Sequence, residues 1–277
     1  MSLSEGLMSG GFIRGCGFLM LGLFVEVTAH ADPVNTYFQL GVSAADFGYQ
    51  EFDEQNVLLD REDGAIPGMM LEFGIDQGSV SAALRFELAD GLVVYDGQTQ
   101  SGTPIKTETD EKITNLQAVL RYKLKPLSQY DVMLIGGVGQ RVWRRDIRAT
   151  NITSSLLEVY RWQYWMLGAS APLWKSGQWS AGIDVRWLRP IQPTMSVHLV
   201  GYDDIQLDLR SRDSARIGFP IRIAAQKEWI LTPYWEWWQL GRSMDKALTV
   251  NGVPTATTVH EPRSDTRIVG ITFSVQL

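Results

Sequence analysis

Apolar and polar residues alternate along most of this chain in segments of about ten residues. The last segment, 267–277, shows the pattern clearly, with small or polar residues between the apolar ones. Its apolar face carries Val269, Ile271, Phe273, Val275 and Leu277. A period of two places each set on one side of a β-strand. Ten residues is also the length of a tilted strand that crosses a bilayer, so the pattern predicts membrane-crossing strands.

The alternation recurs often enough to predict a closed sheet. We place strands near residues 36–47, 66–75, 80–95, 112–124, 131–145, 159–173, 180–188, 215–224, 230–241 and 266–277. Short turns alternate with long polar connections centred on 48–64, 96–111, 146–158, 189–214 and 242–263. This alternation is typical of an up-and-down barrel with tight periplasmic turns and larger outer loops. The fold class is therefore all-β, an up-and-down antiparallel transmembrane β-barrel of about ten strands.

Three features complicate this scheme. Segment 194–210 alternates on both sides of a turn, so it forms either a hairpin that extends two strands outward or an inserted pair that gives twelve strands. Strands 131–145 and 159–173 carry apolar residues on both faces. Pro220 and Pro233 fall inside strands, where each is expected to need a β-bulge because proline cannot donate to the ladder.

Aromatic residues collect near the strand ends. Tyr122, Tyr130, Trp174, Trp179 and Trp229 lie beside short turns. The opposite ends carry Tyr95, Trp143, Tyr160, Trp162, Trp187 and Trp237. Two such groups separated by an apolar band predict the aromatic belts that membrane proteins place at the two interfaces.

The first residues differ from the rest. Arg14 precedes an apolar run from Gly15 to Val25, and Ala29-His30-Ala31 follows as a small-x-small signature. We expect residues 1–31 to be a secretory signal peptide and 32–277 to be the barrel. Because Cys16 is the only cysteine, the mature chain would have neither disulfides nor thiolate metal sites. No other long apolar run is present, so no transmembrane helix is predicted.

These features together resemble small bacterial outer-membrane β-barrel proteins, although such chains commonly end in Phe or Trp and this one ends in Leu277. The resemblance implies a location in the outer membrane of a Gram-negative bacterium. It also implies contact with outer-membrane lipid and lipopolysaccharide, and with the barrel-assembly machinery during insertion. A net charge of −6 does not suggest a nucleic-acid partner.

Charged residues fall on the faces that would line the lumen. They are Glu72, Arg85, Glu87, Arg121, Lys123, Asp184, Arg186, Arg216, Arg222 and Glu236, with Arg141 and Arg161 less regularly placed. Bases outnumber acids, which favours a narrow pore or small-solute channel that prefers anions. Alternatively the charges pair across a narrow lumen and plug it, leaving the outer loops to bind an extracellular partner.

Catalytic chemistry is weakly indicated. The ten-stranded omptin proteases, which place acidic residues and a His–Asp pair across the barrel mouth, imply a rim enzyme as a third hypothesis. His198 lies near Asp203 and Asp204, and His260 precedes Glu261, but no adjacent His–Asp pair is present. We therefore expect no enzyme and no cofactor. The acidic segment 51–63 could attract calcium, yet its spacing is not that of an EF-hand, so a solvated acidic loop and no metal are expected.

Overall fold

The computed structural model describes residues 32–99, 102–124 and 131–277. The chain divides into two units, Met1–Ala31 and Asp32–Leu277. The expected signal peptide and Tyr130 lie outside the described residues. Among the residues that are described, no helix is long and apolar enough to span a membrane.

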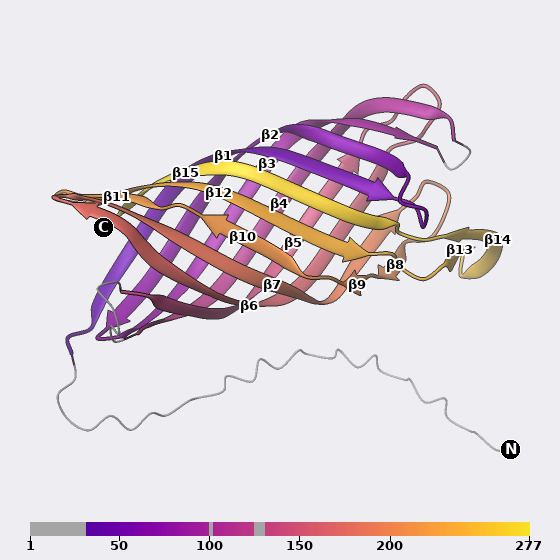
Figure 1. Cartoon of the computed structure of the whole chain (residues 1–277). Helices are drawn as coiled ribbons and strands as arrows, with labels where there is room; N and C mark the ends of the chain where they lie inside the picture. The colour runs from indigo at the N-terminus through magenta and orange to yellow at the C-terminus, as the bar shows by residue number, and fades with distance from the viewer. Residues whose placement is uncertain (1–31, 100–101, 125–130) are drawn as a thin grey trace, which may run out of the picture. The chain divides into compact units, whose positions relative to one another are not determined.

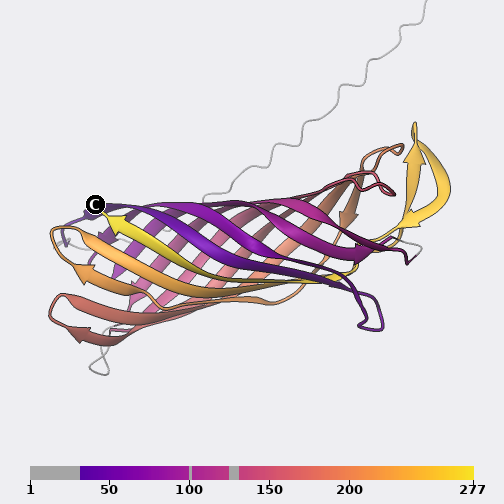
Figure 2. The same ribbon diagram turned by 90° about the horizontal axis from the view of Figure 1, so that it is seen from above.

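The described chain is built from strands. They are β1 (Asn35–Phe52), β2 (Leu58–Gln77), β3 (Val80–Gln98), β4 (Pro104–Lys123), β5 (Met133–Ile147), β6 (Leu156–Ser176), β7 (Trp179–His198), β8 (Ile205–Asp208), β9 (Arg210–Ser211), β10 (Ser214–Gly218), β11 (Ile221–Ala224), β12 (Glu228–Gly241), β13 (Lys246–Val250), β14 (Val253–Val259) and β15 (Arg263–Gln276). Figures 1 and 2 show all but β13 and β14 wrapped into one barrel.

Antiparallel pairing closes the barrel. Each strand from β1 to β7 pairs with the next, β7 and β12 both pair with the β8–β11 pieces, and β15 pairs with β12 and β1. Because β8 to β11 are pieces of one interrupted traverse, the wall has ten traverses in up-and-down order. The predicted fold class is confirmed, and the twelve-strand alternative is wrong. Segment 194–210 extends the wall outward instead, since β8 pairs with the end of β7.

The outer ends of the strands reach far into segments that the sequence suggested were loops. β1 continues to Phe52 and β2 begins at Leu58, so most of the expected loop 48–64 is strand. Part of the last loop forms a separate hairpin, β13–β14. Outside the membrane both faces of a sheet can be polar, and the apolar alternation that marks a lipid-facing strand is lost. The strand bounds were therefore underestimated.

The outer wall carries the apolar band that a bilayer requires. Large apolar side chains point outward and are exposed, for example Val42 at 62%, Leu120 at 61% and Leu167 at 54%. Further along several strands the outward positions become charged, as at Asp46, Asp90 and Lys112. This change marks the outer edge of the membrane-spanning part.

The predicted aromatic belts are only partly correct. Trp174, Trp179, Trp229 and Tyr122 are exposed at the periplasmic ends, and Trp187 is exposed at the other edge of the band. By contrast, Tyr95, Trp143, Tyr160 and Trp162 are buried inside the barrel. The period-two pattern of β5 and β6 was ambiguous for this reason, because both faces of these strands are apolar.

Pro220 and Pro233 do not shift the strand register. Gly218 pairs with Tyr234, and Ile221 pairs with Leu231. The spacing from Gly218 to Ile221 equals the spacing from Leu231 to Tyr234, so no extra residue is inserted on either side. The carbonyl of Pro233 accepts from the Phe219 N–H at 2.9 Å, and the carbonyl of Pro220 accepts from the Gly182 N–H at 2.9 Å. Each proline only lacks its own N–H donor, and the expected bulges are absent at these two positions.

Candidate functional site: the filled interior and the outer rim

Charged side chains interlock inside the membrane-spanning part of the barrel. We name this set the inner network; its members are Glu72, Arg85, Glu87, Arg121, Arg141, Arg216 and Glu236. Glu87 lies at its centre: Arg85 Nη2 donates to Glu87 Oε1 at 2.7 Å. Arg216 Nη1 lies 3.4 Å from the Glu87 carboxylate, and the Asn115 side chain donates a hydrogen bond to that carboxylate at 3.0 Å.

The other acids of the inner network are also shared between arginines. Glu236 accepts from Arg141 at 2.6 Å and from Arg216 at 3.0 Å. Glu72 lies 3.3 Å from Arg85 and 3.2 Å from Arg121. Every acid of the inner network thus contacts two arginines. Buried charges are tolerated in proteins when they are paired and hydrogen-bonded in this way.

The remaining predicted lumen residues lie apart from this centre. Asp184 and Arg186 pair with each other at 2.7 Å on β7. Lys123 and Arg222 lie near the periplasmic ends of their strands, where they contact Asp131 and Glu228 at 2.8 and 3.2 Å. Arg161 is exposed on the outer face of β6 and is not a lumen residue, because its buried neighbours Tyr160 and Trp162 take the inward positions.

The inner network joins opposite walls. Counted around the closed ring, β3 is the third traverse and β8–β11 is the eighth, so Glu87 and Arg216 belong to traverses that are five apart in a ring of ten. Arg141 on β5 and Glu236 on β12 are also far apart around the ring. A cavity of about 50 Å³ lies beside these residues. Side chains from opposite walls therefore meet at this level of the lumen.

A second set of polar residues fills the outer part of the barrel. Arg145 on β5 lies within salt-bridge distance of Glu51, Glu62, Glu111 and Glu158, at 3.2, 3.0, 3.8 and 2.6 Å. Asp60 and Glu261 lie in the same neighbourhood through Tyr95 and Tyr160. We call Arg145 and these six acids the outer cluster. It lies beyond the apolar band of the wall, because Lys112 and Arg144, the outward-facing neighbours of Glu111 and Arg145, are exposed charged residues.

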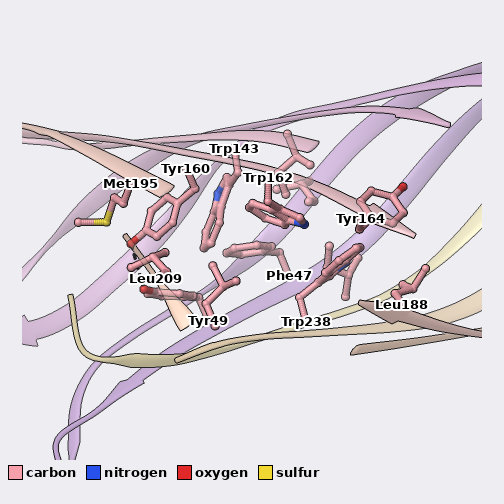
Figure 3. Packing of buried hydrophobic residues seen from close by; sticks show 14 of the residues in the cluster. Phe47, Tyr49, Trp143, Tyr160, Trp162, Tyr164, Leu188, Met195, Leu209 and Trp238 are labelled. Carbon is pink, nitrogen blue, oxygen red and sulfur yellow. Dashed lines mark hydrogen bonds between the residues drawn. The ribbon is translucent and has the colours of Figure 1, made fainter. Parts of the chain in front are cut away.

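Aromatic rings pack around the outer cluster and seal it. Trp143 stacks on Tyr160 with centroids 4.7 Å apart and meets Tyr49 edge-on at 5.1 Å. The Arg145 guanidinium lies 4.1 Å from the centroid of the Tyr49 ring. Figure 3 shows these rings pointing toward one another inside the barrel, with Trp162, Tyr164 and Trp238 continuing the packed core.

One guanidinium cannot neutralise six carboxylates, so the charged form of several acids in the outer cluster is disfavoured. Burial, together with neighbouring acids, raises the pKa of Asp60, Glu111 and Glu261 well above the ordinary value. Burial also raises the pKa of Glu158 to about 7. Burial alone would raise the pKa of Glu62 too, but the charge of Arg145 holds it below the ordinary value.

The outer cluster was missed because its acids fall in a segment that resembles a solvated loop. Glu51, Asp60 and Glu62 are instead buried, with exposures of 7%, 8% and 0%. A signal was available, since Phe47, Tyr49 and Glu51 continue the inward positions of β1 in steps of two. Two carboxylate oxygens, Asp60 Oδ1 and Glu111 Oε1, have no hydrogen-bond partner. Within the described ranges, no group of His, Cys, Asp or Glu residues is arranged to hold a metal ion.

The rim histidines are paired with acids that are not their neighbours in the sequence. His198 Nδ1 lies 2.7 Å from Asp204, and His260 Nδ1 lies 3.0 Å from Asp245. The contacts of Asp203 are of a different kind. It accepts hydrogen bonds from Thr249 Oγ1 at 2.7 Å and from the N–H groups of Asn251 and Gly252 at 3.1 and 2.8 Å. Asp203 therefore holds the tip of the β13–β14 hairpin.

The fold resembles that of known outer-membrane barrels. No protein-family model matches the chain, and no curated protein matches it. The outer membrane protease OmpT from Escherichia coli is similar over 90% of this chain and 98% of its own, with a TM-score of 0.58 and 11% identity. At that identity the likeness establishes the fold alone.

Two further structures cover similar shares of the chain at lower scores. AlkL in lipid bilayers covers 93% of this chain and 97% of its own, with a TM-score of 0.39 and 12% identity. A major outer membrane protein from Thermus thermophilus covers 86% of this chain and 99% of its own, with a TM-score of 0.38 and 12% identity. These scores are too low to support a comparison of sites. The closed wall and its apolar band define a bacterial outer-membrane β-barrel protein, and the chain resides in that membrane.

Proposed function

We propose that this protein is a filled, non-conducting barrel that presents its outer end to a partner outside the cell. The observation that carries the proposal is the contact between Glu87 and Arg216, whose strands lie on opposite sides of the ring. A pore lined by free bases would need those arginines to face water. Here each arginine of the inner network contacts at least one buried acid, which favours a plugged lumen over an anion channel.

The outer end has the features of a presented surface. The long strands carry it beyond the membrane, and β13–β14 projects from it (Figure 2). Asp203 fixes the hairpin tip, so this end is held in one arrangement. Exposed apolar residues lie in this region, among them Met244 at 75% and Val253 at 65%. Loops supported by a rigid scaffold are where binding residues usually lie.

Single-channel recording tests the plugged lumen. The full chain is expressed, the protein is extracted from the outer membrane, and its folded state is checked by a heat-modifiable gel shift before insertion into a planar bilayer. The wild type should show no steady openings, whereas the double variant Glu87→Ser, Arg216→Ser should conduct. Steady openings of the wild type with anion preference, weakened by Arg121→Ala, would establish the pore instead.

The histidine–acid pairs favour a rim hydrolase as a second candidate. A histidine held by a carboxylate can act as a general base, and OmpT, the similar structure, is a protease. Purified protein would be incubated with a library of fluorogenic peptides. Cleavage that is lost in both His198→Ala and Asp204→Ala but kept in Asp208→Ala would support the enzyme. Absence of cleavage by the folded wild type would leave the presenting barrel as the better account.

A further inference from the structure

We propose that the outer wall carries a binding site for the phosphate of an anionic outer-leaflet lipid, on β4, β5 and β6. A shallow groove of about 360 Å³ lies there, lined by Lys112, Thr114, Val142, Arg144, Leu157, Val159 and Arg161. The three strands are neighbours in the wall (Figure 1). This site is independent of whether the lumen conducts.

The groove lies where lipid headgroups are expected. On β4 the outward position Leu116 is exposed and apolar, and Thr114 and Lys112 follow it away from the membrane. On β5 the exposed Val138 is followed outward by Gln140, Val142 and Arg144. The groove thus begins at the outer edge of the apolar band. An anchored lipid would place its acyl chains against the band and its headgroup against the bases.

The bases are arranged as an anion site requires. Lys112 and Arg144 are direct cross-strand partners, and Val142 is the partner of Arg161. Arg161 is therefore the diagonal neighbour of Arg144 across the β5–β6 ladder. Like charges directly opposite each other destabilise a sheet unless an anion lies between them. A phosphate group placed over this triangle would remove that repulsion.

Acids satisfy these bases only in part. Arg144 pairs with Asp146 at 2.7 Å and keeps 51% of its side chain exposed. In the part of the chain that the structure describes, neither Lys112 nor Arg161 has a carboxylate within salt-bridge distance. Arg189 on β7 contrasts with them, because it is bound to Asp213 at 2.8 Å. Asp90 on β3 is a cross-strand partner of Lys112 but does not come within salt-bridge distance of it. The three bases of the groove therefore outnumber the two acids beside them, Asp90 and Asp146.

Outward-facing bases elsewhere near this edge are paired with acids, Arg267 with Asp46 at 3.6 Å and Arg61 with Asp63. At comparable outward positions, β1, β2 and β3 carry Asp46, Asp63 and Asp90. The basic groove on β4 to β6 therefore adjoins an acidic sector. General attraction to an anionic membrane would not require such a sector. The floor of the groove is apolar, with Val142, Leu157 and Val159, which suits the glycerol or sugar-linked acyl region of a lipid better than a free ion.

Native mass spectrometry of protein extracted from the outer membrane tests the site. The probe is lipid A, titrated in detergent, with its dephosphorylated form and inorganic phosphate as separate arms. The triple variant Lys112→Ala, Arg144→Ala, Arg161→Ala should bind lipid A at least about tenfold more weakly, since each base near a membrane surface adds about fivefold. Arg189→Ala, the matched control, should change the affinity less than about twofold.

Comparison of the three probes also distinguishes the phosphate of a lipid from free phosphate. Lipid A should bind much more tightly than its dephosphorylated form, and millimolar inorganic phosphate should displace it only weakly. Equal affinity of the wild type and the triple variant, or equal binding of both lipid forms, would overturn the site. Displacement of lipid A by inorganic phosphate that binds equally tightly would overturn the assignment to a lipid. A heat-modifiable gel shift confirms that the variants, altered only at exposed positions, are folded.

Discussion

The hydroxyl oxygens of Tyr49 and Tyr160 lie 3.4 Å apart, although their strands are the first and sixth traverses of a ring of ten. Two opposite walls therefore touch above the membrane. Both hydroxyls also contact Glu261, at 3.2 and 2.7 Å. The tyrosine contact and the contact between Glu87 and Arg216 therefore join opposite walls at two levels of the barrel. These side chains in the interior hold opposite walls in contact.

Arg145 should be the most sensitive position in the outer cluster. Arg145→Met leaves its acid partners without a cation in a buried site, which typically costs about 3–5 kcal/mol. Thermal unfolding at pH 7 should show a large loss, and the loss should shrink at pH 5 because the acids can then take up protons. Arg148→Met serves as control, since Arg148 is half-exposed and pairs with Glu108 and Asp110. Equal stability of the two variants would contradict the role assigned to Arg145.

The protein should lose stability as the pH rises through neutrality. Asp60, Glu111, Glu158 and Glu261 have raised pKa values, so the folded protein keeps protons that the unfolded chain has already released. Each such group destabilises the fold as the pH rises from its unfolded pKa to its folded pKa, by about 1.4 kcal/mol for each unit of difference.

Unfolding temperatures measured from pH 5 to pH 8 check this expectation. Glu158, whose pKa is raised to about 7, should account for part of the decrease between pH 6 and pH 8. The variant Glu158→Gln does not titrate, so its curve should be flatter in that interval. Glu62 has a lowered pKa and opposes the trend at acid pH, below about its unfolded value. Stability that increases from pH 6 to pH 8 would be the contrary result.

Gly139 should not tolerate a side chain. A Cβ atom there would lie 2.3 Å from the ring of Tyr164, its cross-strand partner. Gly139→Ala would push this ring away from Asn115, which accepts a hydrogen bond from the Tyr164 hydroxyl at 2.8 Å. Overpacking of this kind costs about 1–3 kcal/mol, measurable as a lower temperature of the heat-modifiable gel shift. Gly136→Ala is the matched control, because its Cβ would meet only Leu167 at 3.9 Å.

Asp203 should control the hairpin without controlling the barrel. Asp203→Ala removes the acceptor for Thr249 and for two backbone N–H groups at the tip of β13–β14. Amide hydrogen exchange at residues 249–252 should therefore become faster, whereas the barrel unfolding temperature stays unchanged. Asp204→Ala, which removes only the partner of His198, should leave this exchange slow. Unaltered exchange in Asp203→Ala would show that other contacts hold the hairpin.

The sequence predicted the membrane-spanning wall well. Lipid demands an apolar outward face, so Val80, Leu84 and their neighbours alternate with inward residues that are small or polar in β3. That constraint acts on each strand by itself and is visible in a linear chain. The same alternation also identified Glu72, Glu87 and Arg216 as inward-facing residues. It could not show which acid contacts which arginine, because contacts across the lumen join residues as distant as 87 and 216.

The part outside the membrane required the tertiary structure. Water removes the demand for an apolar outer face, so the strands there lose their marked alternation and resemble polar loops. Glu51 and Glu62 illustrate this, because the period of two can place Glu51 inward but nothing local shows that both acids meet Arg145. The sequence by itself thus determined a transmembrane barrel of about ten strands. Only the closed ring decided which side chains are buried near its axis, because burial there depends on side chains from opposite walls meeting.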